Sequence, residues 1–474
     1  MTESLELRRK SFLDGLFEGY RGPAFAVRLW DGWRWACSGN GAPVCTIVAE
    51  NPKALAALLA APNENTLGEA FIQGSLDVEG DIFSVFSAAE HLFNGPRPLH
   101  RRIAERLASQ LFGIGQRMRH GRVNSRRRDR ASIAYHYDQP VSFFEPWLGR
   151  SLVYSCAYFR SPREPLDQAQ EQKLDLVCRK LRLQPGERFL DIGCGWGSLL
   201  LHAAGAFGAE AHGITLSREQ AATVQRRIRL AELERNCFAE LCDYRELDGS
   251  LQPSRPTPSA GSGQALFAKD AKRMGRQPFD KIASIGMAEH VGLRNLPLYF
   301  RIARGLLRPG GIFLNHAIAR SPLSPIRHNS FVGRYVFPDG QLVTLSEMLT
   351  AAGSQGLEVR DVENLREHYE LTLRCWVEGL RKNESALLSQ VSRTTYRIWL
   401  LYMAGAAAAF RRGDIAIYQT VLSRPDRGSS RMPLTREDIY EDDRDENVPG
   451  KLEPEKLEME RSNGKSVLET SRQG

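Results

Sequence analysis

The glycine-rich run at residues 193–197, GCGWG, is the part of the sequence whose residue types most directly indicate ligand chemistry. It follows a short apolar segment, residues 189–192, that is typical of a buried strand, and it precedes residues 198–207, whose apolar positions have helical spacing. Glycine in such a turn permits positive φ and a close approach of a ligand to the backbone, while the first turn of the helix presents unpaired amide groups. The pattern predicts a site for a nucleotide-type cofactor.

The spacing of these glycines argues against a dinucleotide site. A dinucleotide fingerprint reads GxGxxG and has an acidic residue about 20 positions later that binds a ribose. Here the spacing is GxGxG, and Thr215, Leu216 and Ser217 stand where that acid would be. A tight strand-to-helix connection that binds nothing is the alternative. Residues 214–220 (ITLSREQ) and 242–247 (CDYREL) favour a ligand, because they follow the next two expected strands and would meet at the same sheet edge.

Alternating helical and strand patterns between residues 131 and 425 would position these loops, as in a parallel sheet with helices on both faces. Residues 1–96 mix short apolar runs with a helical stretch and predict a small α+β accessory domain. Composition assigns the rest: residues 97–130 are an Arg-rich connector, residues 249–275 a flexible insertion rich in Pro, Ser and Gly, and residues 426–474 an acidic, largely disordered tail. A chain of 474 residues is long enough for this division.

The formal net charge of +8 is unevenly distributed along the chain. Eleven arginines lie between Arg97 and Arg130, against only two acidic residues, Glu105 and Asp129. Such a run can bind nucleic acid or an anionic membrane surface, or it can simply be solvated. Because no zinc-finger spacing or ribonucleoprotein motif accompanies it, we expect no nucleic-acid partner, and an anionic lipid surface stays open.

The eight cysteines are scattered, with no pair at metal-ligand spacing, which predicts a reducing compartment and no metal site. The N-terminus lacks the pattern of a signal peptide. No segment approaches the ~20 apolar residues that are needed to cross a bilayer. We therefore expect a cytoplasmic protein.

Several longer motifs resemble the cyclopropane fatty acid synthase family. They are LDIGCGWG, ITLSREQ, FDKIASIGMAEHVG, GLLRPGGIFL, YVFPDGQL and NLREHYELTLRCW, and the similarity extends over residues 133–425. Residues 67–82 also resemble the N-terminal domain of longer, bacterial members. The resemblance implies an α/β, Rossmann-like class I methyltransferase fold with a mixed, mostly parallel seven-stranded sheet. It further implies transfer of a methylene from S-adenosylmethionine to a cis double bond of an unsaturated phospholipid acyl chain, forming a cyclopropane.

This chemistry requires a positioned sulfonium, exclusion of water, and a base for the proton that the new methyl group loses. In the family a bound bicarbonate is that base. The resemblance implies that Cys156, Glu289, His316, Tyr369 and the backbone of Ile318 hold it. Each side chain also has a plain structural reading, as a buried thiol, a capping carboxylate, a core histidine or a packed tyrosine. We expect a shared hydrogen-bond network, because a carboxylate and bicarbonate are both anions.

The resemblance also implies which residues contact S-adenosylmethionine. They are Tyr137, Tyr154, Ser155, Asp191, Gly193, Cys194, Gly195, Gly197, Thr215, Leu216, Ser217, Gln220, Asp243 and Tyr244. Ala288 departs from the family pattern, because an aromatic residue usually stands at this position. This departure could widen the pocket or change how the acyl chain lies in it.

A phospholipid substrate implies peripheral docking on the inner face of the membrane, with residues 97–130 and the N-terminal domain as the candidate contacts. A homodimer stays open. So do three other functions: a fatty-acid C-methyltransferase that leaves a methyl branch or a methylene group, a small-molecule amine methyltransferase, and a non-catalytic lipid-binding protein. The complete set of anion-site residues argues against the last, because a binding module has no need of a base.

Overall fold

The computed structural model describes residues 2–37, 40–52, 63–94, 140–247, 277–324, 330–337 and 340–440. The predicted connector (97–130), the predicted insertion (249–275), Tyr137 and the chain beyond residue 440 lie outside these ranges. Within the described ranges, no helix combines the length and the apolar character that a membrane-spanning segment needs.

The N-terminal domain is built on a four-stranded sheet with the order β2-β1-β3-β4. Strands β1 and β3 are parallel, and the other neighbours are antiparallel. Its elements are α1 (Thr2–Leu16), β1 (Pro23–Leu29), β2 (Arg34–Ala36), β3 (Asn40–Ala49), α3 (Glu64–Ile72), β4 (Leu76–Gly80) and α4 (Val85–Asn94). The α+β character predicted for this domain is confirmed.

The second domain contains a seven-stranded sheet with the order β10-β11-β9-β8-β5-β6-β7. Its neighbours are parallel from β9 to β7, whereas β11 runs antiparallel to both β9 and β10. Its strands are β5 (Arg188–Ile192), β6 (Glu210–Thr215), β7 (Cys237–Leu241), β8 (Phe279–Ile285), β9 (Leu307–Arg320), β10 (Glu358–Asn364) and β11 (Ile415–Ser423). This arrangement confirms the predicted class I methyltransferase fold.

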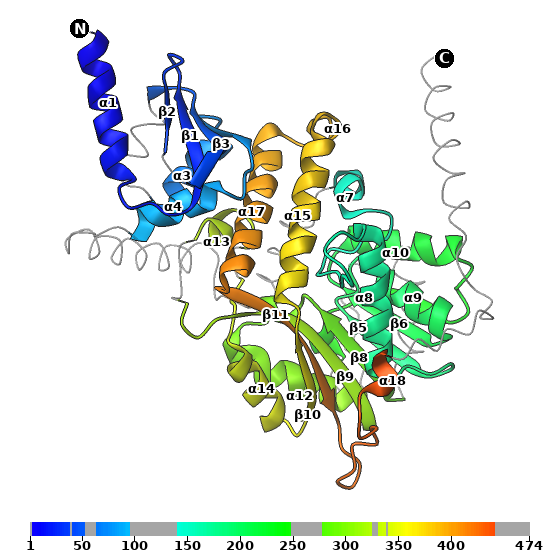
Figure 1. The fold of residues 1–474 in the computed structure, drawn as a ribbon. Coiled ribbons are helices and arrows are strands. Elements are labelled where there is room, and N and C mark those ends of the chain that lie inside the picture. Colours follow the sequence, from blue (N-terminus) through cyan, green and yellow to red (C-terminus); the bar gives the residue numbers. More distant parts are fainter. Residues whose placement is uncertain are drawn as a thin grey trace, which may run out of the picture.

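The helices of this domain lie on both faces of the sheet and beyond its upper edge in Figure 1. They are α7 (Val141–Leu148), α8 (Leu166–Leu181), α9 (Ser198–Phe207), α10 (Arg218–Leu230), α12 (Leu296–Leu306), α13 (Phe331–Tyr335), α14 (Leu345–Ser354), α15 (Arg366–Lys382), α16 (Glu384–Leu388), α17 (Arg393–Arg412) and α18 (Glu437–Tyr440). The short 3-10 helices in the described part of this domain are η1 (Tyr244–Glu246), η2 (Ala288–His290) and η3 (Leu293–Asn295).

Successive strand residues bury into two different cores, as the twofold alternation of a strand requires. Ile282 and Phe313 pack in the core that also contains residues of α12 and α14. Their chain neighbours Ala283 and Leu314 pack in the core that contains residues of α8, α9 and α10. A sheet covered on both faces has its ligand loops at the carboxyl ends of the parallel strands.

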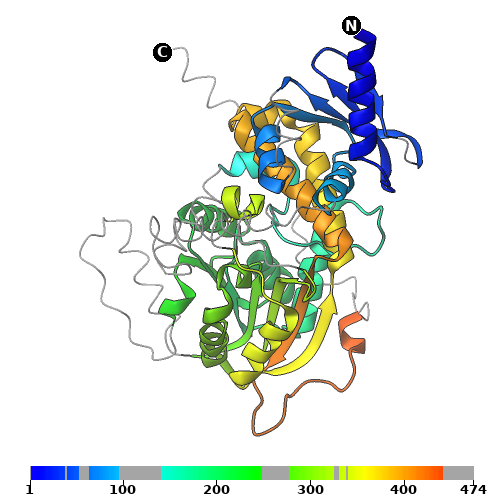
Figure 2. The ribbon, with the colours of Figure 1, turned by 90° about the vertical axis from the view of Figure 1, so that its left-hand side faces the viewer.

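Two long helices, α15 and α17, connect the two domains (Figures 1 and 2). They pack against each other and share an aromatic core with α7 that includes Trp147, Trp376 and Trp399. Phe71 of α3 belongs to the same core. The N-terminal domain is therefore packed onto the second domain through this aromatic layer.

Arg397 is the polar centre of that junction and is only 5% exposed. Its guanidinium donates to the carbonyls of Phe71 (2.7 Å) and Leu76 (2.7 Å) and pairs with Asp77 at 3.1 Å. We expect Arg397→Leu to lower the free energy of unfolding by roughly 2–5 kcal/mol, because it removes the donor to the Leu76 carbonyl and one of the donors to the Phe71 carbonyl, which also accepts from the Gly74 amide. Urea denaturation followed by tryptophan fluorescence measures this loss.

Arg412 provides a matched control on the same helix. It pairs with Glu90 of the N-terminal domain at 3.7 Å, but its side chain is 35% exposed. Arg412→Leu should cost less than about 1 kcal/mol, as for other surface ion pairs. Equal losses for the two variants would contradict a buried junction at Arg397.

The segment after β11 stays with the folded domain up to residue 440. Ile439 of α18 is buried, and its neighbour Asp438 pairs with Arg182 at 2.6 Å. Arg436 pairs with Asp361 of β10 at 2.8 Å. Residues 426–440 therefore do not belong to the disordered tail that composition predicts, because an apolar side chain and two ion pairs hold them in place.

Candidate active site

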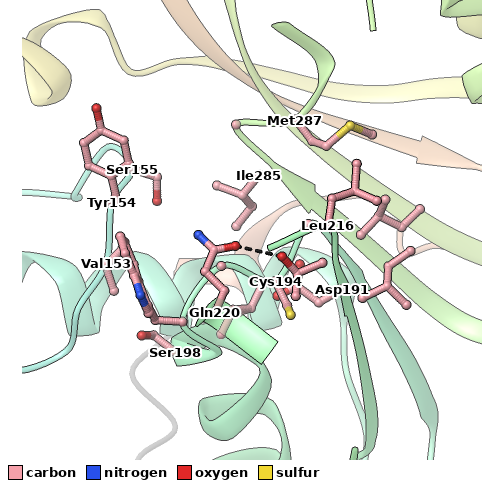
Figure 3. Close-up of a pocket in the computed structure, with 18 of the residues that line it drawn as sticks. Val153, Tyr154, Ser155, Asp191, Cys194, Ser198, Leu216, Gln220, Ile285 and Met287 are labelled. Atoms are coloured by element: carbon pink, nitrogen blue, oxygen red, sulfur yellow. Dashed lines mark hydrogen bonds between the residues drawn. The ribbon is translucent and has the colours of Figure 1, made fainter. Parts of the chain in front are cut away.

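A pocket opens at the carboxyl edge of the parallel strands, where the loops after β5, β6, β7 and β8 meet the segment before α8 (Figure 3). Ten of the predicted cofactor residues line it. They are Tyr154, Ser155, Asp191, Gly193, Cys194, Gly195, Thr215, Leu216, Gln220 and Tyr244. Three loops that are distant in sequence thus converge on one cavity, as the sequence predicts for a ligand site.

Two glycines leave their backbone open to this cavity. Gly195 has φ 54° and Gly286 has φ 67°, and both line the pocket. A Cβ built on either residue would meet no atom within 4 Å. Their peptide groups are therefore accessible to a ligand, which is the geometry that a nucleotide-type cofactor requires.

Gly197 has a different reason to be glycine. Its φ is 83°, and a Cβ built on it would lie 2.7 Å from a methyl carbon of Val224 in α10. It does not line the pocket, unlike the predicted contact. The residue instead allows α9 and α10 to pack closely behind the cofactor turn.

Hydrogen bonds within the loop after β6 fix its shape. The Thr215 hydroxyl donates to Gln220 Oε1 at 2.7 Å, the contact drawn in Figure 3, and accepts from the Ser217 amide at 3.2 Å. Ser217 Oγ accepts from the Gln220 amide at 3.3 Å and thereby caps α10. Ser217 is therefore a helix cap behind the pocket and not part of its lining, while Thr215 and Gln220 line it.

Asp243 also supports the site from behind. It is fully buried, and its carboxylate accepts hydrogen bonds from the backbone amide (3.0 Å), Nε (2.9 Å) and a terminal nitrogen (2.7 Å) of Arg245. Asp243 does not line the pocket, whereas Arg245 and Tyr244 do. In place of the predicted cofactor contact, the structure gives Asp243 the role of bracing this loop.

Lys173 of α8 is a pocket residue that the sequence motifs do not reveal. It is buried, and its ammonium group donates to Ser155 Oγ at 3.1 Å. Burial lowers the pKa of Lys173 to about 8, and burial raises the pKa of Asp191, which also lines the pocket, to about 7. The signal in the sequence is positional, because Lys173 falls on the face of its helix that also carries Ala169, Val177 and Leu181.

Further residues line the pocket, and most of them have apolar side chains that carry no distinctive chemistry in the sequence. They are Leu152, Val153, Leu174, Ile192, Trp196, Ser198, Leu199, Ile214, Cys242, Ile285, Gly286, Met287, His290 and Val291. Most are apolar, which suits the flat rings of a nucleoside. Burial lowers the pKa of His290 to about 4, so this imidazole is neutral near pH 7.

A second polar cluster lies beside the cofactor pocket, around Glu289. Its neighbours Met287 and His290 line the pocket, while Glu289 Oε1 accepts from the Ile318 amide at 2.7 Å. The sequence assigns that amide to a bound anion, but here Glu289 already takes its hydrogen bond. Burial raises the pKa of Glu289 to about 7.

His316 lies two residues before Ile318 on β9, so the two side chains emerge on the same face. It is fully buried, and burial holds the pKa of His316 well below its usual value. Two atoms of this cluster, Glu289 Oε2 and His316 Nε2, have no hydrogen-bond partner among the described residues. Unpaired buried polar atoms cost free energy unless a ligand satisfies them.

Cys156 and Tyr369 reach the same region through backbone contacts. The Cys156 thiol donates to the carbonyl of Leu365 at 3.8 Å, and the Tyr369 amide donates to that same carbonyl at 3.1 Å. The Leu365 amide bonds to Ile417, which pairs with Ile318 on the neighbouring strand. Burial raises the pKa of Cys156, so it is a neutral thiol. Hydrogen bonds and strand pairing therefore link the segments that carry the five predicted anion-site residues.

Ala288 lies in the core beside α12, where it is 3% exposed, and it does not line the pocket. A small residue here is explained by close packing under η2. Within the described ranges no group of His, Cys, Asp and Glu side chains is arranged to hold a metal ion.

The raised pKa of Glu289 predicts a pH effect on stability. In the folded protein the pKa of Glu289 is about 7, above the ordinary value of 4.5, so folding favours the protonated carboxyl. The contribution of this proton to the free energy of unfolding is complete below pH 4.5 and is lost as the pH rises through 7. Glu289→Gln removes this titration and keeps an oxygen for the Ile318 amide. From pH 5 to 8, the variant should gain up to about 3 kcal/mol over the wild type in urea denaturation.

Glu347 provides the control for that measurement. A hydrogen bond from the Thr344 amide holds the pKa of Glu347 below its ordinary value, so its titration ends at lower pH. The difference in free energy of unfolding between Glu347→Gln and the wild type should therefore stay constant between pH 5 and 8. A stability difference for Glu289→Gln that is constant over this range would contradict a raised pKa at Glu289.

Comparison with known proteins identifies the family. Residues 124–253 and 268–420 match the model of the mycolic acid cyclopropane synthetase family. A protein of Pseudomonas putida called "Probable fatty acid methyltransferase" is 37% identical over 420 residues, which cover 87% of this chain and 95% of that protein. Cyclopropane-fatty-acyl-phospholipid synthase of Escherichia coli is 32% identical over 289 residues, which cover 61% of this chain and 66% of that protein.

A solved structure agrees with these sequence relatives. The mycolic acid cyclopropane synthase CmaA1, complexed with SAH and CTAB, superposes with a TM-score of 0.54 at 29% identity, covering 62% of this chain and 97% of that one. SAH is the demethylated product of S-adenosylmethionine, and the glycine turn of this chain offers an open backbone for such a molecule. The predicted resemblance to cyclopropane fatty acid synthases is confirmed. The chain belongs to the mycolic acid cyclopropane synthetase family, and it is an S-adenosylmethionine-dependent methyltransferase.

Proposed function

We propose that the enzyme transfers the methyl carbon of S-adenosylmethionine to a cis double bond of an unsaturated phospholipid acyl chain and closes a cyclopropane ring. The observation that carries this proposal is the unpartnered pair of atoms, Glu289 Oε2 and His316 Nε2, beside the cofactor pocket. Simple methyl transfer to a good nucleophile needs no second polar site at that place. Ring closure does, because a proton must leave the transferred carbon.

Water must be kept from the cation that an alkylated double bond forms. Aromatic side chains supply that wall: Tyr154 lines the pocket, and its ring lies 5.2 Å from the ring of Trp376 and 5.9 Å from that of Trp399. Tyr369 packs against Trp376 at 6.0 Å. These rings also provide an apolar surface for an acyl chain.

Bicarbonate fits the polar pair as a ligand, and when bound it supplies the base that accepts the proton from the new methyl group. A second anion beside Glu289 is tolerated because the pKa of this carboxyl is already about 7. A neighbouring negative charge raises that pKa further, so the Glu289 carboxyl is then largely protonated and uncharged. The protonated carboxyl then donates from Oε2, and His316 completes the set of contacts. Cys156, as a neutral thiol, adds no charge to it.

A phospholipid substrate places the reaction at the cytoplasmic face of the membrane. The acyl chain must leave the bilayer to reach a pocket at the carboxyl edge of the sheet, so we propose peripheral association of the protein with that surface. The relative from Escherichia coli is called a cyclopropane-fatty-acyl-phospholipid synthase, which supports this substrate class.

A second candidate keeps the methyl transfer and changes the fate of the cation. The relative from Pseudomonas putida, which covers most of this chain, is called a fatty acid methyltransferase. Loss of a proton from a chain carbon beside the cation would leave a methyl branch with a double bond. A 1,2-hydride shift that moves the cation to the methylated carbon, followed by loss of a proton from the new methyl group, would leave a methylene group. The position of the base relative to the new methyl group decides between these products.

Expression in a bacterial host that lacks cyclopropane lipids tests the proposal. Membrane fatty acids are analysed by mass spectrometry and by NMR of vinylic protons. A gain of one CH₂ with loss of the double bond supports ring formation, whereas a gain of one CH₂ with a retained double bond assigns the second candidate. Unchanged lipids, with cofactor binding intact by calorimetry, would overturn a lipid substrate.

A further inference from the structure

One buried row of polar side chains crosses the sheet behind the anion site. Glu363 of β10 is paired with Gln419 of β11, and Gln419 is paired with His316 of β9, so the three residues stand side by side on adjacent strands. Lys180 of α8 lies over this row. Lys180, Gln419 and His316 are each 0% exposed.

The hydrogen bonds along this row have a fixed direction. Lys180 Nζ donates to Gln419 Oε1 at 2.7 Å and also to the carboxylate of Glu363. An ammonium group has donors only, so the oxygen of the Gln419 amide must face Lys180. The opposite orientation would place two donors against each other in a buried site, at the cost of an unsatisfied polar group.

The orientation of Gln419 determines the tautomer of His316. With its oxygen facing Lys180, Gln419 directs its NH₂ group at His316 Nδ1, 3.1 Å away. An NH₂ group only donates, so Nδ1 must accept, and the single proton of the neutral imidazole must be on Nε2. Nε2 is the ring nitrogen without a partner among the described residues.

We propose that Lys180 and Gln419 are positioning residues that hold His316 in the Nε2–H tautomer, so that its free nitrogen presents a donor to the anion site. The tautomer follows from the hydrogen bonds alone, and its effect on turnover rests on the proposed function. A nitrogen that carries the proton has no lone pair to offer. His316 is therefore a ligand for the anion and not the base.

Histidine ¹⁵N shifts test this directly, because they distinguish a protonated ring nitrogen from an unprotonated one. The protein is labelled at its ten histidines, and the signal of His316 is identified by its loss in His316→Asn. The wild type, without lipid, should show a protonated Nε2 and an unprotonated Nδ1. A wild-type signal with the proton on Nδ1 would overturn the proposal.

Gln419→Glu almost keeps the shape of the side chain but replaces the NH₂ donor that faces His316 with an acceptor. A carboxylate accepts from both neighbours, so it should draw the proton onto His316 Nδ1. We expect that signal in the spectrum, together with a loss of roughly 100-fold or more in kcat, because a misplaced imidazole proton disables a site that needs the other tautomer. Cofactor affinity should be unchanged, since Gln419 does not line the pocket.

Two further variants keep the test decisive if the glutamate variant does not fold. Lys180→Met removes the donor that orients Gln419, so both tautomers of His316 should appear and kcat should fall. Lys281→Met is the matched control, because Lys281 is also a buried lysine and is paired with Glu187 at 3.7 Å. It lies on the neighbouring strand β8, four residues before Ile285, the residue that pairs with His316. This variant should change neither the His316 signal nor kcat.

The outcomes separate this inference from the proposed function. If His316 carries its proton on Nε2 and the expressed protein leaves lipids unchanged, the proposed lipid reaction is wrong, but the role of Lys180 and Gln419 in fixing the tautomer stands. If lipids are cyclopropanated and Lys180→Met leaves both the His316 tautomer and kcat as in the wild type, the positioning role of Lys180 and Gln419 is wrong.

Discussion

Glu289→Gln is expected to reduce kcat by about 100-fold or more while leaving the affinity for S-adenosylmethionine nearly unchanged. The amide oxygen can still accept from the Ile318 amide, now 2.7 Å from Glu289 Oε1, so the local fold is kept. The NH₂ group that replaces Oε2 cannot share or release a proton toward a bound anion. Proton sharing of this kind contributes on the order of 10²–10⁴ to the rate of a proton-transfer step.

The expected separation of kcat from cofactor affinity follows from geometry. Glu289 itself does not line the cofactor pocket, although Met287 and His290 beside it do. The turnover number is measured from lipid product, and the dissociation constant of S-adenosylmethionine by calorimetry. Glu347→Gln, whose side chain belongs to a capping box that glutamine also supports, is the control and should retain both values. A parallel loss of turnover and affinity in Glu289→Gln would instead place Glu289 in the cofactor site.

The sequence predicted the place of the site because parallel strands carry their loops to one edge. Strand β5 lies between β6 and β8, so the glycine turn after residue 192 necessarily adjoins the loops at 214–220 and 286–292. The parallel direction of the strands brings these loops together at one sheet edge, whatever side chains the loops carry. The motif residues that depend only on it, such as Gly195 and Thr215, indeed line the pocket.

Residues whose role depends on an individual partner could not be predicted in this way. Asp243 lies at a strand end like a ligand residue, yet its carboxylate accepts three hydrogen bonds from Arg245, two residues later. Ser217 caps a helix instead of facing the cavity. Nothing in the residue type distinguishes a carboxylate or hydroxyl that binds a ligand from one that binds its own loop.

The buried lysines were missed for a related physical reason. Charged residues on a helix normally face water, and Lys173 and Lys180 are internal because each meets a polar partner, Ser155 for Lys173 and Gln419 of β11 for Lys180. Gln419 is 239 residues from Lys180 in the chain, so their contact has no local signature. The same holds for the junction of Arg397 with the N-terminal domain.

Gly195→Leu is expected to weaken the binding of S-adenosylmethionine by about 100-fold or more in a protein that still folds. A Cβ at this position meets no atom within 4 Å, so the added side chain enters the cavity and not the core. It would occupy space and cover a peptide group that the cofactor needs. Calorimetry with S-adenosylmethionine measures the loss, which is about 3 kcal/mol for a 100-fold change.

A leucine with positive φ also strains the backbone, and a control must remove that contribution. Gly186 has φ 78°, and a Cβ on it also meets no atom within 4 Å, but it lies in an exposed turn before β5 and outside the pocket. Gly186→Leu should therefore carry a similar strain of about 1–2 kcal/mol in stability and bind the cofactor normally. Normal binding of S-adenosylmethionine by Gly195→Leu would mean that the cofactor does not approach this turn. If both variants bound the cofactor equally weakly, the cause would be backbone strain transmitted through β5 and not a blocked pocket.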